Sequence, residues 1–260
     1  MNAILLCAGF ATRMWPLTKD LPKALLDVGG KPVIDHLIAQ ILDFRGLDSI
    51  AIVTNDRFFG HFLEWGEKNG GEITERGISL NILNDGVYLA EKRLGAAGDL
   101  GFAVSQIRDS NGTVVAAGDN IFRFPLGPCW EKFLSGDKSY VLALKTDDVK
   151  KLRKTGVLEL DEEDRVLAFH EKPGNPPSNF ACPALYFLKP GALNLIHEYL
   201  SSHGAQDEIG YFISYLAKHD AIYAFRAEGE AIDIGTVESY ERAKRILSGE
   251  PVIYKGRQRT

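Results

Sequence analysis

The segment from Leu6 to Lys23 (LCAGFATRMWPLTKDLPK) places small residues, a hydroxyl and cations in one loop. Backbone amides of a turn built from small residues, such as Ala8 and Gly9, can approach phosphate oxygens closely. Arg13 can bind phosphate through two parallel hydrogen bonds, and Lys23 adds a compact positive charge. The segment therefore predicts a binding site for a triphosphate.

The spacing of this loop separates it from two common phosphate-binding motifs. It is neither Gly-x-x-x-x-Gly-Lys-Ser/Thr nor Gly-x-Gly-x-x-Gly, so the P-loop and dinucleotide interpretations fail at the motif level. The alternative is a surface loop with solvated charges. The combination of small residues and three functional side chains, directly after a strand-like run, favours phosphate binding over that alternative.

Apolar runs and a helical repeat surround this loop. Residues 2–6 (NAILL) form a short strand-like run, and residues 32–45 carry apolar side chains at helical spacing, between Pro32 and Gly46, which suit the two ends of a helix. Further strands are expected at 49–53, 78–83, 113–117 and 140–144, and a helix at 58–69. Strands that alternate with helices favour a mainly parallel, layered α/β sheet.

Two polar segments follow directly after predicted strands. Ala8-Gly9 comes after the first strand, and Gly118-Asp119-Asn120 comes after the strand at 113–117. Ligand sites of such sheets collect beyond the carboxyl ends of the strands, so we expect these segments to lie close together. Asp119 taken alone is also good turn chemistry.

The pattern changes beyond Lys150. Two alternating β-runs, joined by the acidic turn 161–164, predict a surface hairpin that could carry acceptor-binding elements. A strand at 183–188 and helices at 192–199, 211–217 and 238–247 complete the expected elements.

Composition narrows the class of protein. The 260 residues carry a formal net charge of −5, which argues against a nucleic-acid or anionic membrane surface, although four basic and only two acidic residues lie between Met1 and Lys31. No apolar stretch reaches the length of a membrane span, and we expect a soluble cytoplasmic protein, with self-association left open. Three distant cysteines (Cys7, Cys129 and Cys182) suggest buried free thiols.

The full pattern Ala-Gly-x-x-Thr-Arg-x-x-Pro-Leu-Thr-x-x-x-Pro-Lys, from Ala8 to Lys23, resembles the signature of the sugar-1-phosphate nucleotidyltransferases, also called NDP-sugar pyrophosphorylases. The resemblance continues in family order over nearly the whole chain, through Asp27 to Pro32, Gly95 to Gly98, Gly118-Asp119-Asn120, Gly156-Val157, Glu171-Lys172-Pro173 and Asp233 to Thr236. So long an ordered set of matches makes chance similarity implausible.

The resemblance implies a Rossmann-like, mainly parallel mixed sheet with helices on both faces, the nucleotide-diphospho-sugar transferase fold. It implies one domain over residues 1–260, with 1–145 mainly nucleotide-binding, 146–235 mainly acceptor-binding, and 236–260 a C-terminal helix and tail. Several family members carry a hexapeptide-repeat β-helix after the catalytic part; for this chain we expect a stand-alone catalytic domain.

The resemblance also assigns roles on the nucleotide side. Gly9, Arg13 and Lys23 would hold the phosphates, and Asp119 and Asp233 would bind Mg²⁺ between the nucleotide and acceptor phosphates. Two carboxylates that leave room for water and phosphate are ligands that this hard cation accepts. The expected nucleotide-binding residues are Ala8, Gly9, Thr12, Arg13, Gly95 and Gly98, and the expected catalytic residues are Arg13, Lys23 and Asp119.

On the acceptor side, Glu171 and Lys172 match the family's Glu-Lys-Pro. There the glutamate bonds sugar hydroxyls and the lysine reaches the acceptor phosphate. Gly156 would let the backbone approach the sugar, and Asn179 is a further candidate for a hydroxyl contact. The implied reaction joins a nucleoside triphosphate to a sugar 1-phosphate and releases pyrophosphate. The acceptor phosphate is already mostly ionised at neutral pH, since its second pKa is about 6, so no general base is needed.

Three positions depart from the family pattern. Ala11 stands where a second glycine is usual, and a β-carbon there restricts the backbone. Gly98 stands where one branch of the family has a glutamine that helps to select the base, and Thr155 stands where tyrosine is common. Base and sugar therefore stay open. The acceptor could instead be phosphocholine or an inositol phosphate, with CTP as donor, and a non-catalytic nucleotide-sugar-binding regulator is an alternative of another class.

Overall fold

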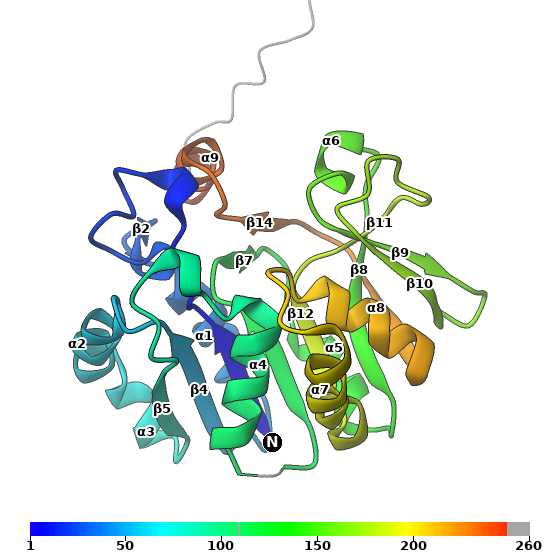
Figure 1. Ribbon diagram of the computed structural model, residues 1–260, viewed down its shortest axis with the longest axis horizontal. Helices are drawn as coiled ribbons and strands as arrows, with labels where there is room; N and C mark the ends of the chain where they lie inside the picture. Colours follow the sequence, from blue (N-terminus) through cyan, green and yellow to red (C-terminus); the bar gives the residue numbers. More distant parts are fainter. Residues whose placement is uncertain (109, 249–260) are drawn as a thin grey trace, which may run out of the picture.

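The computed structural model describes residues 1–108 and 110–248. Of the predicted C-terminal helix and tail at 236–260, residues 249–260 lie outside the described ranges. A ten-stranded mixed sheet runs in the order β10-β9-β11-β8-β12-β6-β1-β4-β5, with β13 on β8 (Figure 1). Helices cover both faces, as predicted, so the expected α/β architecture is confirmed.

The parallel part of the sheet consists of β5 (Ser79–Asn84), β4 (Ser49–Thr54), β1 (Asn2–Leu6) and β6 (Thr113–Ala117). The three inner strands read as near-continuous apolar runs because both of their faces are buried. Their carboxyl ends meet along one edge of the sheet. Gly118 donates its N–H to the Leu6 carbonyl at 3.1 Å, which ties the two functional strand ends together.

The other part of the sheet contains mostly antiparallel pairs. β12 (Leu185–Leu188) lies antiparallel between β6 and β8 (Ser139–Lys145), and β13 (Ile222–Ala227) runs parallel to β8. β9 (Gly156–Leu160) and β10 (Val166–Glu171) form the predicted hairpin, and β11 (Phe180–Cys182) joins it to β8. Because β12 extends the first part directly, residues from both halves of the chain share one continuous sheet.

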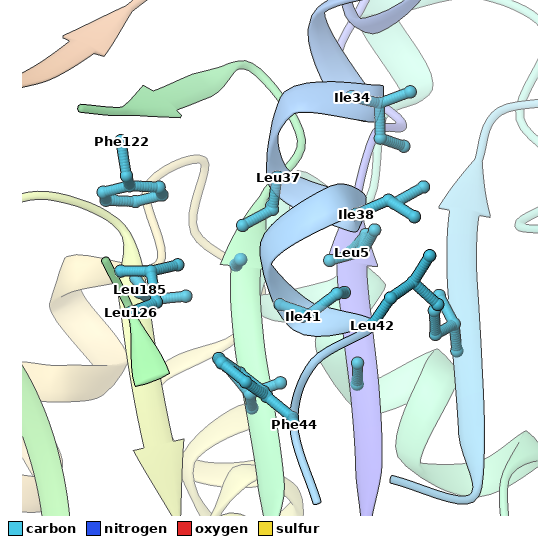
Figure 2. Packing of buried hydrophobic residues seen from close by; sticks show 14 of the residues in the cluster. Leu5, Ile34, Leu37, Ile38, Ile41, Leu42, Phe44, Phe122, Leu126 and Leu185 are labelled. Atoms are coloured by element: carbon cyan, nitrogen blue, oxygen red, sulfur yellow. The ribbon is translucent and has the colours of Figure 1, made fainter. Parts of the chain in front are cut away.

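Two apolar cores lie on the two faces. The first packs α1 (Val33–Ile41), α2 (Phe59–Asn69) and α5 (Gly127–Leu134) against the sheet. Figure 2 shows Leu37, Ile38 and Ile41 of α1 in one cluster with Leu5 of β1. The second packs α4 (Gly95–Gln106), α7 (Pro190–His203) and α8 (Gly210–His219) on the opposite face. The spacing of apolar residues in each helix sets which face it buries.

Small elements lie beyond the carboxyl ends of the parallel strands. β7 (Asn120–Phe122) pairs antiparallel with β14 (Ala231–Asp233), β2 (Asp27–Val28) pairs with β3 (Lys31–Pro32), and α9 (Val237–Leu247) packs beside them. A third apolar cluster, which includes Met14, Ile121, Ile232 and Tyr240, joins α9 to the predicted phosphate-binding segment at residues 6–23, here called the phosphate loop. α9 begins with a capping box of Thr236 and Ser239.

The remaining elements are short. They comprise α3 (Gly71–Glu75), α6 (Val149–Leu152) and the 3₁₀ turns η1 (Thr12–Met14), η2 (Lys23–Leu25) and η3 (Ala90–Lys92). The three cysteines are buried and free, as expected. Among residues 1–108 and 110–248, none of the helices is long and apolar enough to cross a membrane.

Candidate active site

The phosphate loop begins where β1 ends and is anchored by its neighbours. Cys7 donates its N–H to the Val53 carbonyl at 2.8 Å, and the buried Asn55 side chain donates to the Ala8 carbonyl at 2.8 Å. Gly9 is exposed, and a β-carbon built on it would meet no heavy atom within 4 Å. The backbone at Ala8-Gly9 is therefore held rigidly while one face of it stays open to a ligand.

Ala11 adopts the left-handed conformation, with φ 47° and ψ 39°. Its carbonyl accepts from Met14 N at 2.9 Å and from the buried Thr18 hydroxyl at 2.8 Å, which closes the loop. Only glycine adopts this conformation without steric cost, so the glycine usual in the family has a physical reason, and Ala11 adopts it at a cost in strain. Thr12 and Arg13 follow in η1 with exposed side chains.

Lys23 lies at the start of η2 and donates a hydrogen bond from Nζ to Asp119 Oδ2. Burial lowers the pKa of Lys23, but the charges of Asp119 and Asp233 outweigh it and the pKa is raised. Lys23 is therefore a fixed cation beside both carboxylates.

Gly118 brings Asp119 to this position. A β-carbon at Gly118 would overlap with the Cys7 sulfur, so the chain can leave β6 this close to β1 only with glycine. Asn120 then donates from its amide to Asp119 Oδ1 at 3.0 Å. The first strand end and the fourth are thus packed directly together, as the sequence predicted.

Asp233 reaches the same place through the small β7–β14 ribbon. It pairs with Asn120 in the ladder, and Ile234 donates its N–H to the Asp119 carbonyl at 3.0 Å. Asp233 is exposed to solvent, but neighbouring protein atoms exclude part of the water around its carboxylate. This desolvation raises the pKa of Asp233 to about 6. The charge of Asp119 adds to this increase, and those of Lys23, Arg13 and Lys172 oppose it.

These contacts bring the predicted catalytic groups into one site. Arg13 and Lys23 from the nucleotide side and Lys172 from the acceptor side all act electrostatically on Asp233. Within the described ranges, no group of three or more histidine, cysteine or acidic side chains is placed to hold a metal. Two neighbouring carboxylates with cations beside them instead fit a hard ion that takes its remaining ligands from phosphate and water.

The predicted acceptor side is built by packing around Glu171. This carboxylate ends β10, and its side chain is only 9% exposed. Burial raises the pKa of Glu171 to about 7, with Lys172 opposing and Glu208 adding to the increase. A β-carbon at Gly210, the first residue of α8, would overlap with Glu171 Oε2 and contact the Phe169 ring, so glycine there leaves room for the carboxylate.

Gly156 has a related role on the neighbouring strand. It pairs with Glu171 across the β9–β10 hairpin, and a β-carbon there would overlap with the Phe169 ring. Lys172 follows with a positive φ of 44° and donates its N–H to the Thr155 carbonyl at 3.2 Å. Its Nζ donates to Glu208 Oε1 at 2.5 Å and lies 3.9 Å from Glu171 Oε1.

Three predicted residues lie differently from the rest. Gly156 pairs with Glu171 on one neighbouring strand and with Cys182 on the other. Asn179 comes three positions before Cys182, which is about 10 Å along the strand direction. Gly95 and Gly98 begin α4, and β-carbons on them would crowd Gln206 and Ala205 rather than open space. Asn179 therefore lies at a different level of the sheet from Glu171, and the two glycines face the loop that follows α7.

Sequence analysis missed two acidic pairs near these segments. Asp99, on the buried side of α4, interacts with Asp85 at the end of β5; burial and the charge of Asp85 raise the pKa of Asp99 to about 8. Asp207 and Glu208 bond Arg93 and Lys172 respectively. Neither pair belongs to a motif, and only the tertiary structure brings the partners together.

Comparison with known proteins identifies the family of the chain. The family model described as "Nucleotidyl transferase" matches residues 2–249. The UTP--glucose-1-phosphate uridylyltransferase AglF of Haloferax volcanii is 26% identical over 256 residues, covering 96% of this chain and 98% of the relative. The bifunctional protein GlmU of Methanocaldococcus jannaschii is 28% identical over 258 residues, but the chain spans only 54% of its length.

Solved structures show the same architecture. A Bacillus anthracis protein, described as a glucose-1-phosphate thymidylyltransferase in complex with a sucrose, superimposes with a TM-score of 0.82 at 26% identity, covering 96% of each chain. A UDP-glucose pyrophosphorylase complexed with UDP-glucose gives a TM-score of 0.76 at 22% identity, covering 94% of this chain and 97% of the other. The latter likeness concerns the fold alone.

Proposed function

Because the chain belongs to the nucleotidyl transferase family, we propose that it joins a nucleoside triphosphate to a sugar 1-phosphate, giving an NDP-sugar and pyrophosphate. The observation that carries the proposal is the pair of carboxylates, Asp119 and Asp233, held beside the Lys23 ammonium. Lys23 donates to Asp119, and Asp233 pairs with the neighbouring Asn120. The charges of Arg13 and Lys172 also act on Asp233, so cations from both predicted substrate segments surround this pair of carboxylates.

The reaction is an in-line displacement. An acceptor phosphate oxygen attacks the α-phosphorus of the triphosphate, the new P–O bond forms, and the bond to the pyrophosphate leaving group breaks. The attacking oxygen is already ionised because the second pKa of a phosphate monoester is about 6. The protein's task is therefore to position the substrates and neutralise charge, with Arg13 and Lys23 on the triphosphate and Lys172 on the acceptor phosphate.

Mg²⁺ is the proposed cofactor, held by Asp119 and Asp233. When bound, it neutralises charge on the phosphates and orients them. Asp119 is fixed for this role by Lys23 and Asn120, and Asp233 by its ladder pairing with Asn120. Glu171 is proposed to accept hydrogen bonds from sugar hydroxyls, with Gly156 close to the sugar. A cytoplasmic location remains part of the proposal.

The test is a panel of ATP, CTP, GTP, UTP and dTTP crossed with sugar 1-phosphates and phosphocholine, read as pyrophosphate released with Mg²⁺. We expect turnover with at least one sugar 1-phosphate. Asp119→Asn and Asp233→Asn should each lower it by about 10²–10³-fold, as loss of a preorganised charge contact does. Turnover with phosphocholine alone, or with no pair at all, contradicts the proposal.

A matched control keeps the test specific. Asp137→Asn removes an exposed carboxylate from the turn before β8 and should leave turnover unchanged. Circular dichroism of every variant checks that the fold is kept. Unchanged pyrophosphate release in folded Asp119→Asn would show that the metal assignment is wrong.

A further inference from the structure

The loop between α7 and α8, residues 204–209, contacts both predicted substrate segments. Arg93 donates from Nε to Asp207 Oδ1 at 2.8 Å and from Nη2 to Asp207 Oδ2 at 2.5 Å, a two-point contact. Ala96 donates its N–H to the Asp207 carbonyl at 3.1 Å. One residue of the loop is thus bonded to both ends of the turn that begins α4.

Gly95 allows the start of α4 to pack closely against the loop at residues 204–209. Its φ of +74° turns the chain towards the loop, and a β-carbon on it would overlap with the Gln206 carbonyl oxygen. Arg93 also donates from Nη1 to the Ala90 carbonyl at 3.1 Å, so its guanidinium holds η3 as well. The loop therefore fixes residues 90–98, which include the glycines predicted to meet the nucleotide.

The next residue of the loop faces the acceptor side. Glu208 Oε1 accepts from Lys172 Nζ at 2.5 Å, whereas Glu171 is 3.9 Å from the same nitrogen. Both side chains of the Lys172–Glu208 pair are partly exposed, at 40% and 36%, so an incoming anion can reach the ammonium. A phosphate would compete with Glu208 for the same charge.

We propose that Asp207 and Glu208 are positioning residues that couple the acceptor site to the nucleotide segment. Glu208 holds Lys172 until the acceptor phosphate replaces it. The loop, released from Lys172, stays bonded to the nucleotide segment through Arg93 and Ala96, and residues 90–98 are then held more tightly for the nucleotide. This inference rests on the proposed function because it takes Lys172 as the ligand of the acceptor phosphate. Coupling of this kind is reciprocal, so each substrate strengthens binding of the other.

The first test is Glu208→Gln, with UTP and glucose 1-phosphate or GTP and mannose 1-phosphate as probe pairs and the more active pair kept. Without the competing carboxylate, the KM for the sugar 1-phosphate should fall about two- to fivefold, the range expected for a partly exposed ion pair. A purely structural role, or a contact from Glu208 to the sugar, would raise this KM. An unchanged or raised KM overturns the proposal.

The second test measures the KM for the triphosphate at low and at saturating sugar 1-phosphate. In the unaltered protein it should fall about two- to fivefold as the acceptor saturates. In Glu208→Gln, the KM for the triphosphate should be at the lower value at every concentration of sugar 1-phosphate. In Asp207→Asn and in Arg93→Met, it should stay at the higher value. The double variant Asp207→Asn/Arg93→Met should match either single variant, because both substitutions remove the same contact. Persistence of the acceptor dependence in folded Asp207→Asn overturns the proposal.

Glu131→Gln is the control, since it breaks the exposed Arg45–Glu131 ion pair far along the chain from this loop. It should leave both KM values unchanged. Failure of the proposed function is distinguishable, because the unaltered protein would then release no pyrophosphate with any triphosphate and sugar 1-phosphate of the panel. Failure of the coupling leaves an active enzyme whose two KM values are independent.

Discussion

The proposed nucleotide side and the proposed acceptor side of this molecule are built by different means. On the nucleotide side, the ends of parallel strands and tight turns place backbone amides, and Lys23 and Asp119 bond each other directly. On the acceptor side, glycines at 156 and 210 make room for Phe169 and Glu171, so packing sets the position of the carboxylate. Substitutions on the first side should therefore change turnover, and those on the second should change stability and acceptor binding together.

Lys23→Met tests the first half of this contrast and should have the largest effect. The variant keeps the length of the side chain but removes the charge beside Asp119 and the triphosphate. We expect kcat/KM to fall by about 10²–10³-fold, or about 3–4 kcal/mol of transition-state stabilisation. Steady-state kinetics with the most active probe pair measure this change. An unaltered kcat/KM in Lys23→Met would exclude a contact between Lys23 and the phosphates. Lys172→Met should instead act mainly on the KM for the acceptor.

Glu171→Gln tests the second half through pH. The pKa of Glu171 is about 7 in the folded protein and about 4.5 when unfolded, so between these values the folded state holds a proton that the unfolded state has released. Stability therefore falls as pH rises from about 4.5 to about 7, by about 3 kcal/mol in all. Glutamine does not titrate, so Glu171→Gln does not lose this stability. Its free energy of unfolding should therefore rise relative to that of the unaltered protein as pH increases over this range.

Urea unfolding at several pH values between 5 and 8 measures this difference. Glu163→Gln, in the exposed turn between β9 and β10, is the control and should follow the unaltered protein at every pH. A constant difference between Glu171→Gln and the unaltered protein would mean that burial does not perturb this carboxyl.

Local sequence signals were enough for some elements and not for others. The helix at 32–45 was predicted because apolar spacing and end signals agree, and it appears as α1, ending somewhat earlier at Ile41. α4 was missed because three glycines (Gly95, Gly98 and Gly101) give it poor intrinsic helix propensity. β-carbons at Gly98 and Gly101 would crowd Ala205 and Leu200, so close packing on α7 and its following loop explains these glycines.

The site shows the same division. The motifs predicted that Arg13, Lys23, Asp119 and Lys172 belong to one site, and in the structure the charges of all four act on Asp233. The bond from Lys172 to Glu208 could not be foreseen, since the two residues lie 36 positions apart and Glu208 belongs to no motif. Pairings of that kind depend on how α7 and α8 pack, which single-sequence periodicity does not encode.

Gly210→Ala sharpens the packing half of the comparison with a smaller effect. The added methyl group must displace Glu171 and the Phe169 ring, and overpacking of this kind costs about 1–3 kcal/mol. We expect a lower free energy of unfolding together with a raised KM for the acceptor. Gly191→Ala is the matched control, because Gly191 also lies in the first turn of a helix and a β-carbon there meets nothing within 4 Å. Equal effects of the two substitutions would contradict the packing argument.

Ala11→Gly should have the smallest effect and tests whether backbone conformation alone governs the phosphate loop. Left-handed backbone costs an alanine about 1–2 kcal/mol, while glycine loses about 0.4–1 kcal/mol more entropy on folding, so the variant should gain roughly 0.5–1 kcal/mol. Ala90→Gly, at a similarly half-buried residue of η3 without a positive φ, should lose stability instead. Thermal unfolding measures both. Since Ala11 already holds the turn, kcat should change little; a large rise would mean that the alanine also obstructs the approach of phosphate.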